Sequence, residues 1–319
     1  MRSKKIYRIL EYNWINRALT ALVFLFIYCL PGFSQSNIRI NNYWENTYYI
    51  NPASIYGEYN FVLTGAGRKQ WINFPGAPQT FFTTFTAYSD HLNTQLGLKF
   101  FSDKIGYTSL KNLSLSYSYS VKLDDAHKLN LGVSGNVQDV LYDMNEANTE
   151  TIGDPVVYAN QNKMTNFNAD VGFELVGRYF LIGASSQNLL SLFNEDNKLQ
   201  TNASFLYGSY NMLSEQPVRL RTGITFIKND ALNQLEFNLS SYFSFNRHPD
   251  LFQLGALYRT NNEIAALFSI DLISSVRLAY SYDFFIGDIR RSSYGSQEIM
   301  LIWKFSEIPG CATCYKLFK

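Results

Sequence analysis

The sequence is short of the residues that catalysis and metal binding use most. It has three histidines and three cysteines in 319 residues, and it contains no glycine-rich phosphate loop. His91, His127 and His248 stand far apart and match no H-x-x-x-H or H-E-x-x-H spacing. His127 is the one candidate for a serine–histidine pair, because the serine-rich stretch 114–120 precedes it, but a polar residue beside a hairpin turn is the favoured interpretation. We therefore expect a protein that is not an enzyme and that holds no metal and no cofactor.

Charge of either sign is also scarce. The chain carries 27 Lys plus Arg against 26 Asp plus Glu, a formal net charge of +1, and charged residues make up 17% of it. A soluble globular domain has roughly 25%. The near-neutral balance excludes a nucleic-acid binder that relies on bulk positive charge. The hydrophobic content of 46% and aromatic content of 16% exclude a disordered chain.

Long hydrophobic runs are missing, with one exception near the N-terminus. The run Ala18–Leu30 follows several basic residues and precedes the small-x-small sequence Gly32–Ser34, which predicts a secretory signal peptide over residues 1–34 and cleavage before Gln35. The alternative is a retained anchor helix, which the shortness of the run disfavours. No second stretch approaches the roughly 18–20 residues of a transmembrane helix, so we do not expect a helical bundle of the inner membrane. Without residues 1–34 the chain has 22 basic and 25 acidic groups.

The rest of the chain alternates between apolar and polar residues over long stretches. In residues 113–121, leucine, tyrosine and valine occupy every odd position and serine occupies every even one. Residues 167–174 and 276–284 repeat the pattern. Successive side chains of a strand point to opposite sides, so each such segment has one apolar and one polar face. The pattern predicts β-strands.

Fourteen such segments lie between Phe61 and Phe305. Their length suits strands that cross a bilayer at a tilt, and an even number suits a closed outer-membrane barrel. We predict an all-β fold, a transmembrane antiparallel β-barrel of about 14 strands, because hydrocarbon offers no partner to an open sheet edge. The expected strands are Phe61–Gly67, Thr80–Tyr88, Thr94–Phe101, Ser109–Lys122, His127–Val140, Thr165–Val176, Tyr179–Ser185, Ala203–Tyr210, Val218–Ile227, Leu232–Phe245, Leu251–Arg259, Glu263–Ile270, Ser275–Phe285 and Gln297–Phe305.

A soluble β-sandwich is the alternative fold, because its strands alternate in the same way. Three features favour the barrel, with outer-membrane lipid as a partner. The polar faces hold Ser, Asn, Gly, Thr and Gln more than Lys and Glu. The apolar faces come from nearly every segment, and aromatic pairs gather at segment ends, as in interfacial girdles. These pairs are Tyr117/Tyr119, Tyr242/Phe243, Tyr280/Tyr282 and Trp303/Phe305.

The expected organisation is one domain with short additions. Residues 1–34 are the signal peptide, 35–58 an N-terminal periplasmic or plug-like segment, 59–306 the outer-membrane barrel and 307–319 a short C-terminal tail. Longer polar stretches at 143–166 and 187–202 are candidate extracellular loops. The expected location after cleavage is the bacterial outer membrane.

The tail contains Cys311-Ala-Thr-Cys314, and the mature chain has no other cysteine. A haem attachment would need histidine where Tyr315 stands, and a zinc site would need a second cysteine pair. A local disulfide between Cys311 and Cys314, which the periplasm permits, is the favoured interpretation. A labile thiol pair used for partner docking is the alternative.

A dense motif lies between the first two expected strands. Arg68, Lys69, Gln70 and Trp71 precede the run Phe74-Pro75-Gly76-Ala77-Pro78-Gln79-Thr80. Gly76 and the flanking prolines, including Pro78, predict a tight turn between cations and an aromatic ring. An interfacial hairpin whose basic groups reach toward water is a sufficient interpretation.

Together with Asn51-Pro52-Ala53 and Ser102-Asp103-Lys104-Ile105-Gly106, this motif resembles the PorP/SprF family of type IX secretion system outer-membrane proteins. Weaker similarities lie at Ile182–Ser185 and Gly295–Ile299, where Gln297 stands in place of the histidine of many members. The resemblance extends over essentially the whole mature chain. It implies a barrel of about fourteen strands in the outer membrane of a Gram-negative bacterium.

The resemblance also implies a role as an outer-membrane component of type IX protein secretion. Such a protein supports the export or surface attachment of a partner. The partner is either a secreted adhesin-like cargo with a C-terminal secretion domain or the periplasmic type IX machinery. Arg68, Lys69, Gln70, Trp71, Gly76 and Pro78 are then candidate partner-binding or structural residues. The alternative function is an outer-membrane channel or transporter of small hydrophobic solutes.

Overall fold

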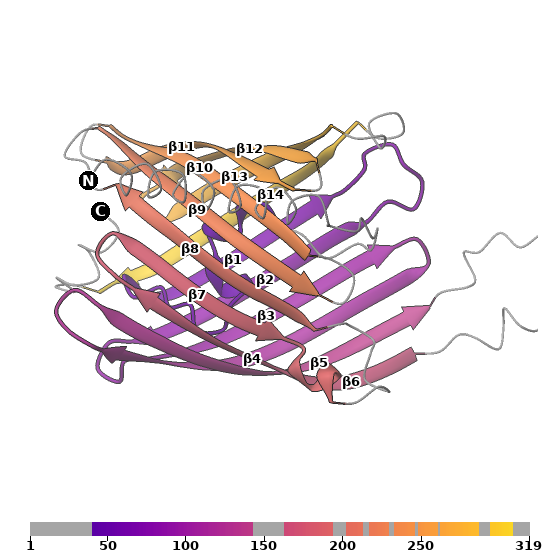
Figure 1. The fold of residues 1–319 in the computed structure, drawn as a ribbon, viewed down its shortest axis with the longest axis horizontal. Helices are drawn as coiled ribbons and strands as arrows, with labels where there is room; N and C mark the ends of the chain where they lie inside the picture. The colour runs from indigo at the N-terminus through magenta and orange to yellow at the C-terminus, as the bar shows by residue number, and fades with distance from the viewer. Residues whose placement is uncertain are drawn as a thin grey trace, which may run out of the picture.

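The computed structural model describes residues 40–142, 163–193, 202–212, 217–229, 233–245, 248–260, 262–286 and 294–308. Within them the chain forms antiparallel strands, and β1 pairs with β14 so that the sheet closes into a barrel (Figure 1). The strands are β1 (Tyr59–Lys69), β2 (Gln79–Ser89), β3 (Thr94–Ile105), β4 (Thr108–Lys122), β5 (Lys128–Tyr142), β6 (Lys163–Val176), β7 (Phe180–Gln187), β8 (Ala203–Met212), β9 (Val218–Asn229), β10 (Asn233–Phe245), β11 (His248–Arg259), β12 (Glu263–Ile273), β13 (Val276–Phe285) and β14 (Ser296–Glu307). The predicted fold class, a closed antiparallel barrel of 14 strands, is confirmed.

Each of the fourteen predicted segments corresponds to one strand, and no boundary differs by more than four residues. The largest difference is at β3, which continues from Phe101 to Ile105. Ser102–Lys104 carry no apolar alternation, yet they stay paired with both β2 and β4. Strand pairing is a property of the backbone, so the ladder continues beyond the point where the side-chain pattern ends. For the same reason β6 already begins at Lys163, inside a predicted loop.

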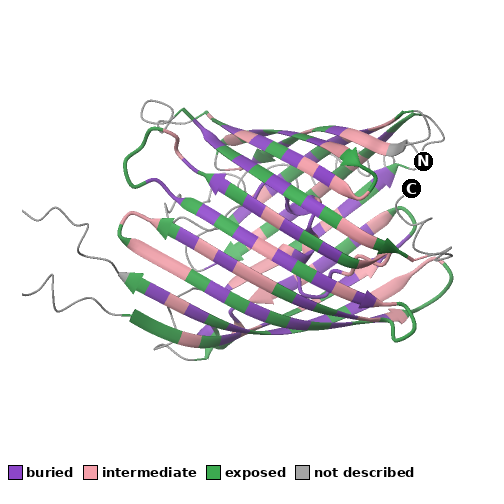
Figure 2. Cartoon of the chain, turned by 180° about the vertical axis from the view of Figure 1, so that it is seen from behind, coloured by how far each residue is buried: buried purple, intermediate pink, exposed green. Residues whose placement is uncertain are grey.

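The alternation sorts side chains between the outside of the barrel and its lumen, as Figure 2 shows by burial along each strand. On β4, Ser114, Ser116 and Ser118 are at most 3% exposed, whereas Leu115 is 64% and Tyr117 49% exposed. Apolar residues therefore face outward, where acyl chains would solvate them, and polar residues face inward. This is the reverse of a soluble protein and the arrangement of a transmembrane barrel.

One expected interfacial aromatic is wrong. Tyr242 is 2% exposed and points into the lumen, where its hydroxyl donates a hydrogen bond to Glu45. It lies on the same face of β10 as the buried polar residues Asn238 and Ser240. Position parity decides the face of a strand residue, and a tyrosine suits a polar interior when its hydroxyl finds a partner.

The helical elements are short 3₁₀ turns: η1 (Asn42–Trp44), η2 (Thr47–Tyr49) and η4 (Leu189–Leu192). None of the helices in the described ranges is long and apolar enough for a membrane span. The signal peptide predicted over residues 1–34 and the Cys311/Cys314 pair lie outside the described residues.

The two ends of the barrel differ in their connections. At the end where β1 begins and β14 finishes, here called the termini end, no connection between strands exceeds five residues. At the opposite end, here called the loop end, the connections after β5 and β7 have 20 and 15 residues. Outer-membrane barrels have short periplasmic turns and longer extracellular loops, so this asymmetry indicates which end of the barrel would face the periplasm.

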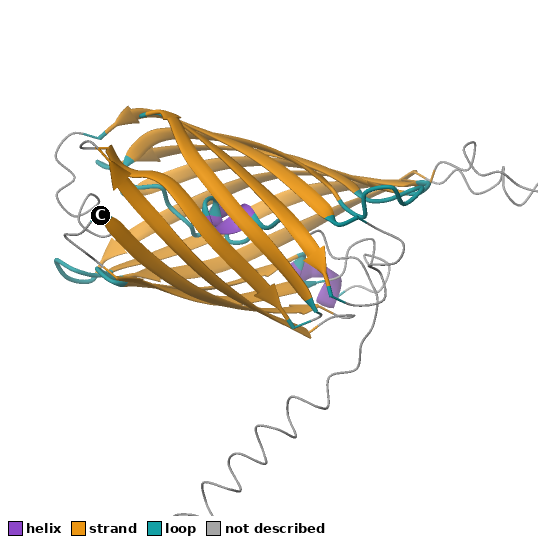
Figure 3. Ribbon diagram, turned by 90° about the horizontal axis from the view of Figure 1, so that it is seen from above, coloured by secondary structure: helices purple, strands orange, loops and turns teal. Residues whose placement is uncertain are grey.

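Residues 40–58, here called the lumen segment, lie inside the ring of strands, where the two helical turns are visible from above (Figure 3). Small residues on the strands make room for this segment. A Cβ atom at Gly132 would collide with the backbone of Pro52 and Ala53. One at Gly223 would come within 2.7 Å of the Trp44 ring. The barrel wall is therefore shaped around the segment.

Candidate functional site

Hydrogen bonds from many strands hold the lumen segment along its length. Its amides and hydroxyls satisfy polar groups that would otherwise be buried without partners, which is the condition for a stable polar interior. These contacts include Tyr43 with Thr225 (2.8 Å), Asn46 with Thr84 (2.9 Å), Tyr48 with Ser116 (2.7 Å) and Asn51 with Tyr207 (2.9 Å). The lumen of the described barrel is therefore occupied by its own N-terminal chain.

A group of buried charged side chains holds the lumen segment near the loop end. This loop-end cluster consists of Arg68, Glu236, Arg259, Asp283 and Glu298, each at most 5% exposed. Arg259 lies 2.7 Å from Glu236 and 3.6 Å from Asp283, and Arg68 pairs with Asp283 and Glu298.

The loop-end cluster binds backbone N–H groups in the first turn of the lumen segment. The Glu298 carboxylate accepts hydrogen bonds from the backbone N–H groups of Asn41 (2.8 Å) and Asn42 (3.0 Å). The Asn41 side chain donates to Asp283 at 2.7 Å and accepts from Arg259. One asparagine thus joins a carboxylate to a guanidinium, and the cluster holds Asn41 and Asn42 of the lumen segment in place.

A second group of charges holds the segment near the termini end. Glu45 lies 3.1 Å from Arg221 and 3.3 Å from Arg277, and it accepts a hydrogen bond from the Tyr242 hydroxyl at 2.8 Å. Burial by itself pushes the pKa of Glu45 upward. The guanidiniums of Arg277 and Arg221 outweigh burial and lower that pKa to about 2. Glu45 is therefore ionised at any physiological pH.

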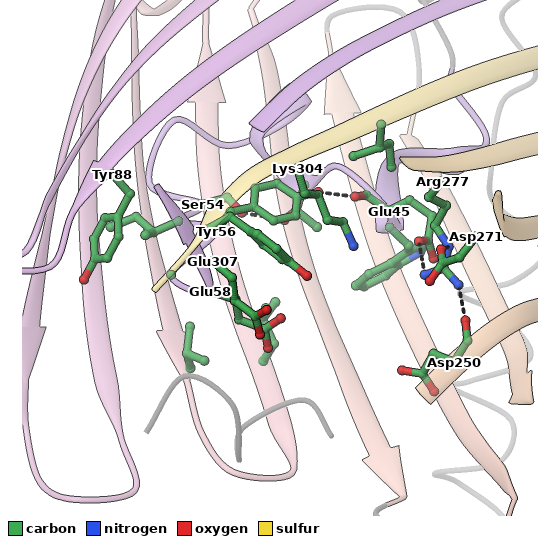
Figure 4. A pocket seen from close by; sticks show the side chains of 18 of the residues that line it. Glu45, Ser54, Tyr56, Glu58, Tyr88, Asp250, Asp271, Arg277, Lys304 and Glu307 are labelled. Carbon is green, nitrogen blue, oxygen red and sulfur yellow. Dashed lines mark hydrogen bonds and ion pairs between the residues drawn. The ribbon is translucent and has the colours of Figure 1, made fainter. Parts of the chain in front are cut away.

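A cavity of about 660 Å³ lies at the termini end, and Glu45 forms part of its wall (Figure 4). The lumen segment supplies one side, from Trp44 to Glu58, and strand residues and turns supply the rest. Acidic and basic groups alternate around it: Asp250 pairs with Arg219 at 2.6 Å, and Asp271 pairs with Arg277 at 3.0 Å. Aromatic rings and charges converge on one hollow, the composition that favours a binding site.

The predicted motif residues lie at the opposite end, in the β1–β2 connection. Arg68 is buried in the loop-end cluster, whereas its neighbour Lys69 is exposed. Gln70 is 8% exposed and its backbone N–H donates to the carbonyl of Pro78. The structure therefore separates the two cations: one belongs to the interior and one to the surface.

The turn itself is tied to neighbouring connections. Trp71 has a left-handed backbone (φ 45°), and its N–H donates to Ser296 of β14. Gly76 also has positive φ (70°), and its carbonyl accepts the N–H of Gly106 from the β3–β4 turn. The motif thus links three connections at the loop end into one packed surface.

Sequence reasoning missed the cavity and the residues of the lumen segment that build it. Glu45, Arg221 and Arg277 do not form a motif in sequence, since they come from three distant elements. One signal was available: Arg277 and Asp283 are charged residues on the polar face of an otherwise weakly charged strand. A charge placed inside a barrel needs a partner, and that partner could be the N-terminal segment.

Of the remaining candidates, the structure describes His127 but not the Cys311/Cys314 pair. His127 lies in an exposed turn, with its ring Nδ1 2.8 Å from Asp124. Within the described ranges no three His, Cys, Asp or Glu side chains gather as metal ligands would.

The chain is similar in sequence to one protein family. A family model described as type IX secretion system membrane protein PorP/SprF matches residues 32–303. No curated protein matches the chain at a significant level.

Several solved barrels are similar in shape, with low sequence identity. The toluene transporter TbuX of Ralstonia pickettii has 9% identity and a TM-score of 0.49, covering 81% of this chain and 92% of that one. The toluene transporter TodX of P. putida has 8% identity and a TM-score of 0.48, covering 88% and 97%. The CymD monoaromatic hydrocarbon channel has 10% identity and a TM-score of 0.46, covering 81% and 92%. Values this low carry no conclusion about what this chain binds.

Proposed function

The chain belongs to the PorP/SprF family of type IX secretion system membrane proteins, and from that membership we propose that it supports export or surface attachment of a partner protein. The proposed partner is a secreted adhesin-like cargo, through its C-terminal secretion domain, or the periplasmic type IX machinery. The barrel acts in the outer membrane as a binding platform.

The observation that carries this proposal is the occupied lumen. Asn41, Glu45 and Asn51 are each hydrogen-bonded to side chains or carbonyl groups of the wall, on different strands. A passage for solutes would need these buried groups to leave their partners, and each unpaired buried polar group costs about 1–3 kcal/mol. A platform needs no such movement. The occupied lumen therefore favours a protein-binding role over the alternative of a channel or small-solute transporter.

The direction of the barrel supports a periplasmic contact. The rule of short periplasmic turns puts the termini end, and with it the 660 Å³ cavity, on the periplasmic side. A periplasmic component or a cargo domain that has not yet left the periplasm would meet this cavity first. We therefore place the main partner contact there.

The motif at the loop end has a structural role in this proposal. Arg68 is held between Asp283 and Glu298, and the backbone N–H of Trp71 donates to Ser296 at the start of β14. If Arg68→Ala and Trp71→Ala variants insert normally and still support display of the partner, the motif does not contribute to function.

The test of the function is deletion of the gene followed by analysis of the surface proteome. We expect one large secreted protein to be lost from the surface while uptake of small hydrophobic solutes continues. The channel alternative predicts the reverse: normal surface display, reduced uptake, and conductance of the purified barrel in planar bilayers. Wild-type protein supplied from a plasmid is the control.

A further inference from the structure

The wall of the cavity at the termini end contains a buried carboxyl group, Glu174, with no cation beside it among the described residues. Glu174 is 1% exposed and forms part of the cavity wall. It accepts a hydrogen bond from the Tyr207 hydroxyl at 2.7 Å, and the side chains of Asn130 and Ser54 reach the same group. In the part of the chain that the structure describes, no lysine, arginine or histidine nitrogen lies within 4.0 Å of it.

The groups around Glu174 donate hydrogen bonds to its carboxyl oxygens. Asn51 donates to the Tyr207 oxygen at 2.9 Å, and the Tyr207 hydroxyl in turn donates to Glu174. These donors leave the carboxyl group of Glu174 as the acceptor at the end of the chain. Buried charges are normally paired, because an isolated one is costly to remove from water. Glu174 differs in this respect from Glu45 of the same cavity wall, which has two guanidiniums beside it.

The side-chain oxygen of Asn130, next to Glu174, lacks a hydrogen-bond donor. Asn130 is opposite Glu174 in the β5–β6 register and is 3% exposed. Its side-chain oxygen is buried without a hydrogen-bond partner, although Asn130 forms part of the cavity wall. Native structures leave few such oxygens unsatisfied, and one that borders a cavity is a place for a ligand that donates hydrogen bonds.

We propose that the cavity receives a lysine or arginine side chain of a periplasmic protein partner, with Glu174 and Asn130 as acceptors. This inference rests on the proposed function, because it names the chemistry of the partner. The rings of Trp44 and Tyr56 belong to the same wall, and aromatic faces attract cations. One carboxylate with neutral oxygens suits a single organic cation better than a divalent metal ion, which prefers several carboxylates.

The geometry allows a long side chain to reach this point. Glu174 is two residues from the end of β6 at Val176, which is about 7 Å of strand. Arg219 and Arg221, which are also in the wall, do not oppose a cation strongly, because Asp250 and Glu45 neutralise them at 2.6 and 3.1 Å. Lys128 is a further cation of the cavity wall, so its removal should have the opposite effect on cation binding to the removal of Glu174.

The experiment compares a cationic probe with its neutral isostere. Mature protein in detergent micelles is titrated with Nα-acetyl-arginine amide and with Nα-acetyl-citrulline amide, and binding is followed through the fluorescence of Trp44 in the cavity wall. A Trp44→Phe variant identifies the signal. We expect saturable binding of the arginine amide only. Glu174→Gln should weaken this binding about tenfold or more, because a hydrogen bond to a charged group is lost.

Two variants act as controls. Glu307→Gln makes the same chemical change at an exposed position of the cavity mouth, where water screens the charge, and should alter binding less than about twofold. Lys128→Gln removes a like charge and should strengthen binding. All variants must retain heat-modifiable migration on gels, the sign of a folded barrel.

The outcomes separate this inference from the function on which it rests. If the arginine amide binds no better than the citrulline amide, or if Glu174→Gln binds it as wild type does, the cationic side-chain site is wrong. A strain with Glu174→Gln is then expected to display the partner normally, and only the deletion strain loses it. If instead the deletion strain displays every surface protein, the proposed function fails, whatever the titration shows.

Discussion

The two ends of the lumen use the same kinds of side chains for opposite purposes. At the loop end, Arg68, Arg259 and Asp283 are packed around the start of the lumen segment and are at most 5% exposed. At the termini end, Glu45 and Arg277 form part of the wall of a 660 Å³ cavity. Charged side chains therefore pack around the chain at one end of the lumen and border a cavity at the other.

The difference lies in how completely the charges are matched. Each carboxylate of the loop-end cluster has a guanidinium within 4.0 Å. Two backbone N–H groups of the lumen segment complete the coordination of Glu298. At the termini end the pairing is incomplete at Glu174. A matched buried set contributes modest net stability but strongly penalises loss of one member, so the loop-end cluster fixes the position of the segment.

The largest effect is expected at the loop-end cluster. Arg259→Met leaves Glu236 without a cation and removes a donor to Asn41. We expect destabilisation of about 3–5 kcal/mol, because a buried charge loses its partner. The measurement is the urea midpoint of the barrel in detergent, read by heat-modifiable gel migration.

The matched control for Arg259→Met is Arg178→Met in the exposed connection between β6 and β7. Arg178 is exposed and stacks on the Tyr179 ring, at 5.5 Å from the ring centre, and its loss should cost less than about 1 kcal/mol. Equal midpoints for the two variants would contradict the view that matched burial seals this end.

A smaller effect is expected at the termini end, and it should depend on pH. The folded pKa of Glu45, about 2, is below the ordinary 4.5, so its stabilisation is present above about pH 4.5 and is lost as the pH falls toward 2. At neutral pH, Glu45→Gln should cost about 3 kcal/mol. Protease access to the lumen segment, measured as the pH falls from 7 to 2, should rise more steeply in wild type than in the variant, which still has the carboxylates of the loop-end cluster.

The control for Glu45→Gln is Asp124→Asn. Asp124 accepts backbone N–H groups of Ala126 and His127 at 2.7 and 2.8 Å, yet it lies in an exposed turn. Because water screens these contacts, the substitution should leave the pH response of the lumen segment unchanged. A variant at Asp124 that abolished this response would refute the assignment to Glu45.

The fold was predictable from the sequence because its main determinant is local. The alternation of serine with leucine and tyrosine in β4 sets the face of each side chain without knowledge of any partner. The site was not predictable, because its parts are joined only by folding. Asn41 meets Asp283 across 242 positions, and Glu45 meets Arg277 across 232. Tyr242 shows where the sequence prediction ends. Its aromatic side chain predicted a position at the membrane interface, whereas its place in the alternation of β10 puts it in the lumen.

The smallest effect concerns the fit between the wall and the lumen segment, which both ends share. Gly132→Ala places a Cβ against the backbone of Pro52 and Ala53. A backbone cannot relieve the overlap by changing rotamer, as a side chain could. We expect a loss of about 1–3 kcal/mol and faster proteolysis of the segment. Gly135→Ala on the same strand is the control, since it faces outward and its Cβ would meet no atom within 4 Å. If Gly132→Ala were as stable as Gly135→Ala, the segment would have to shift as a unit, and the loop-end cluster could not be what fixes its position.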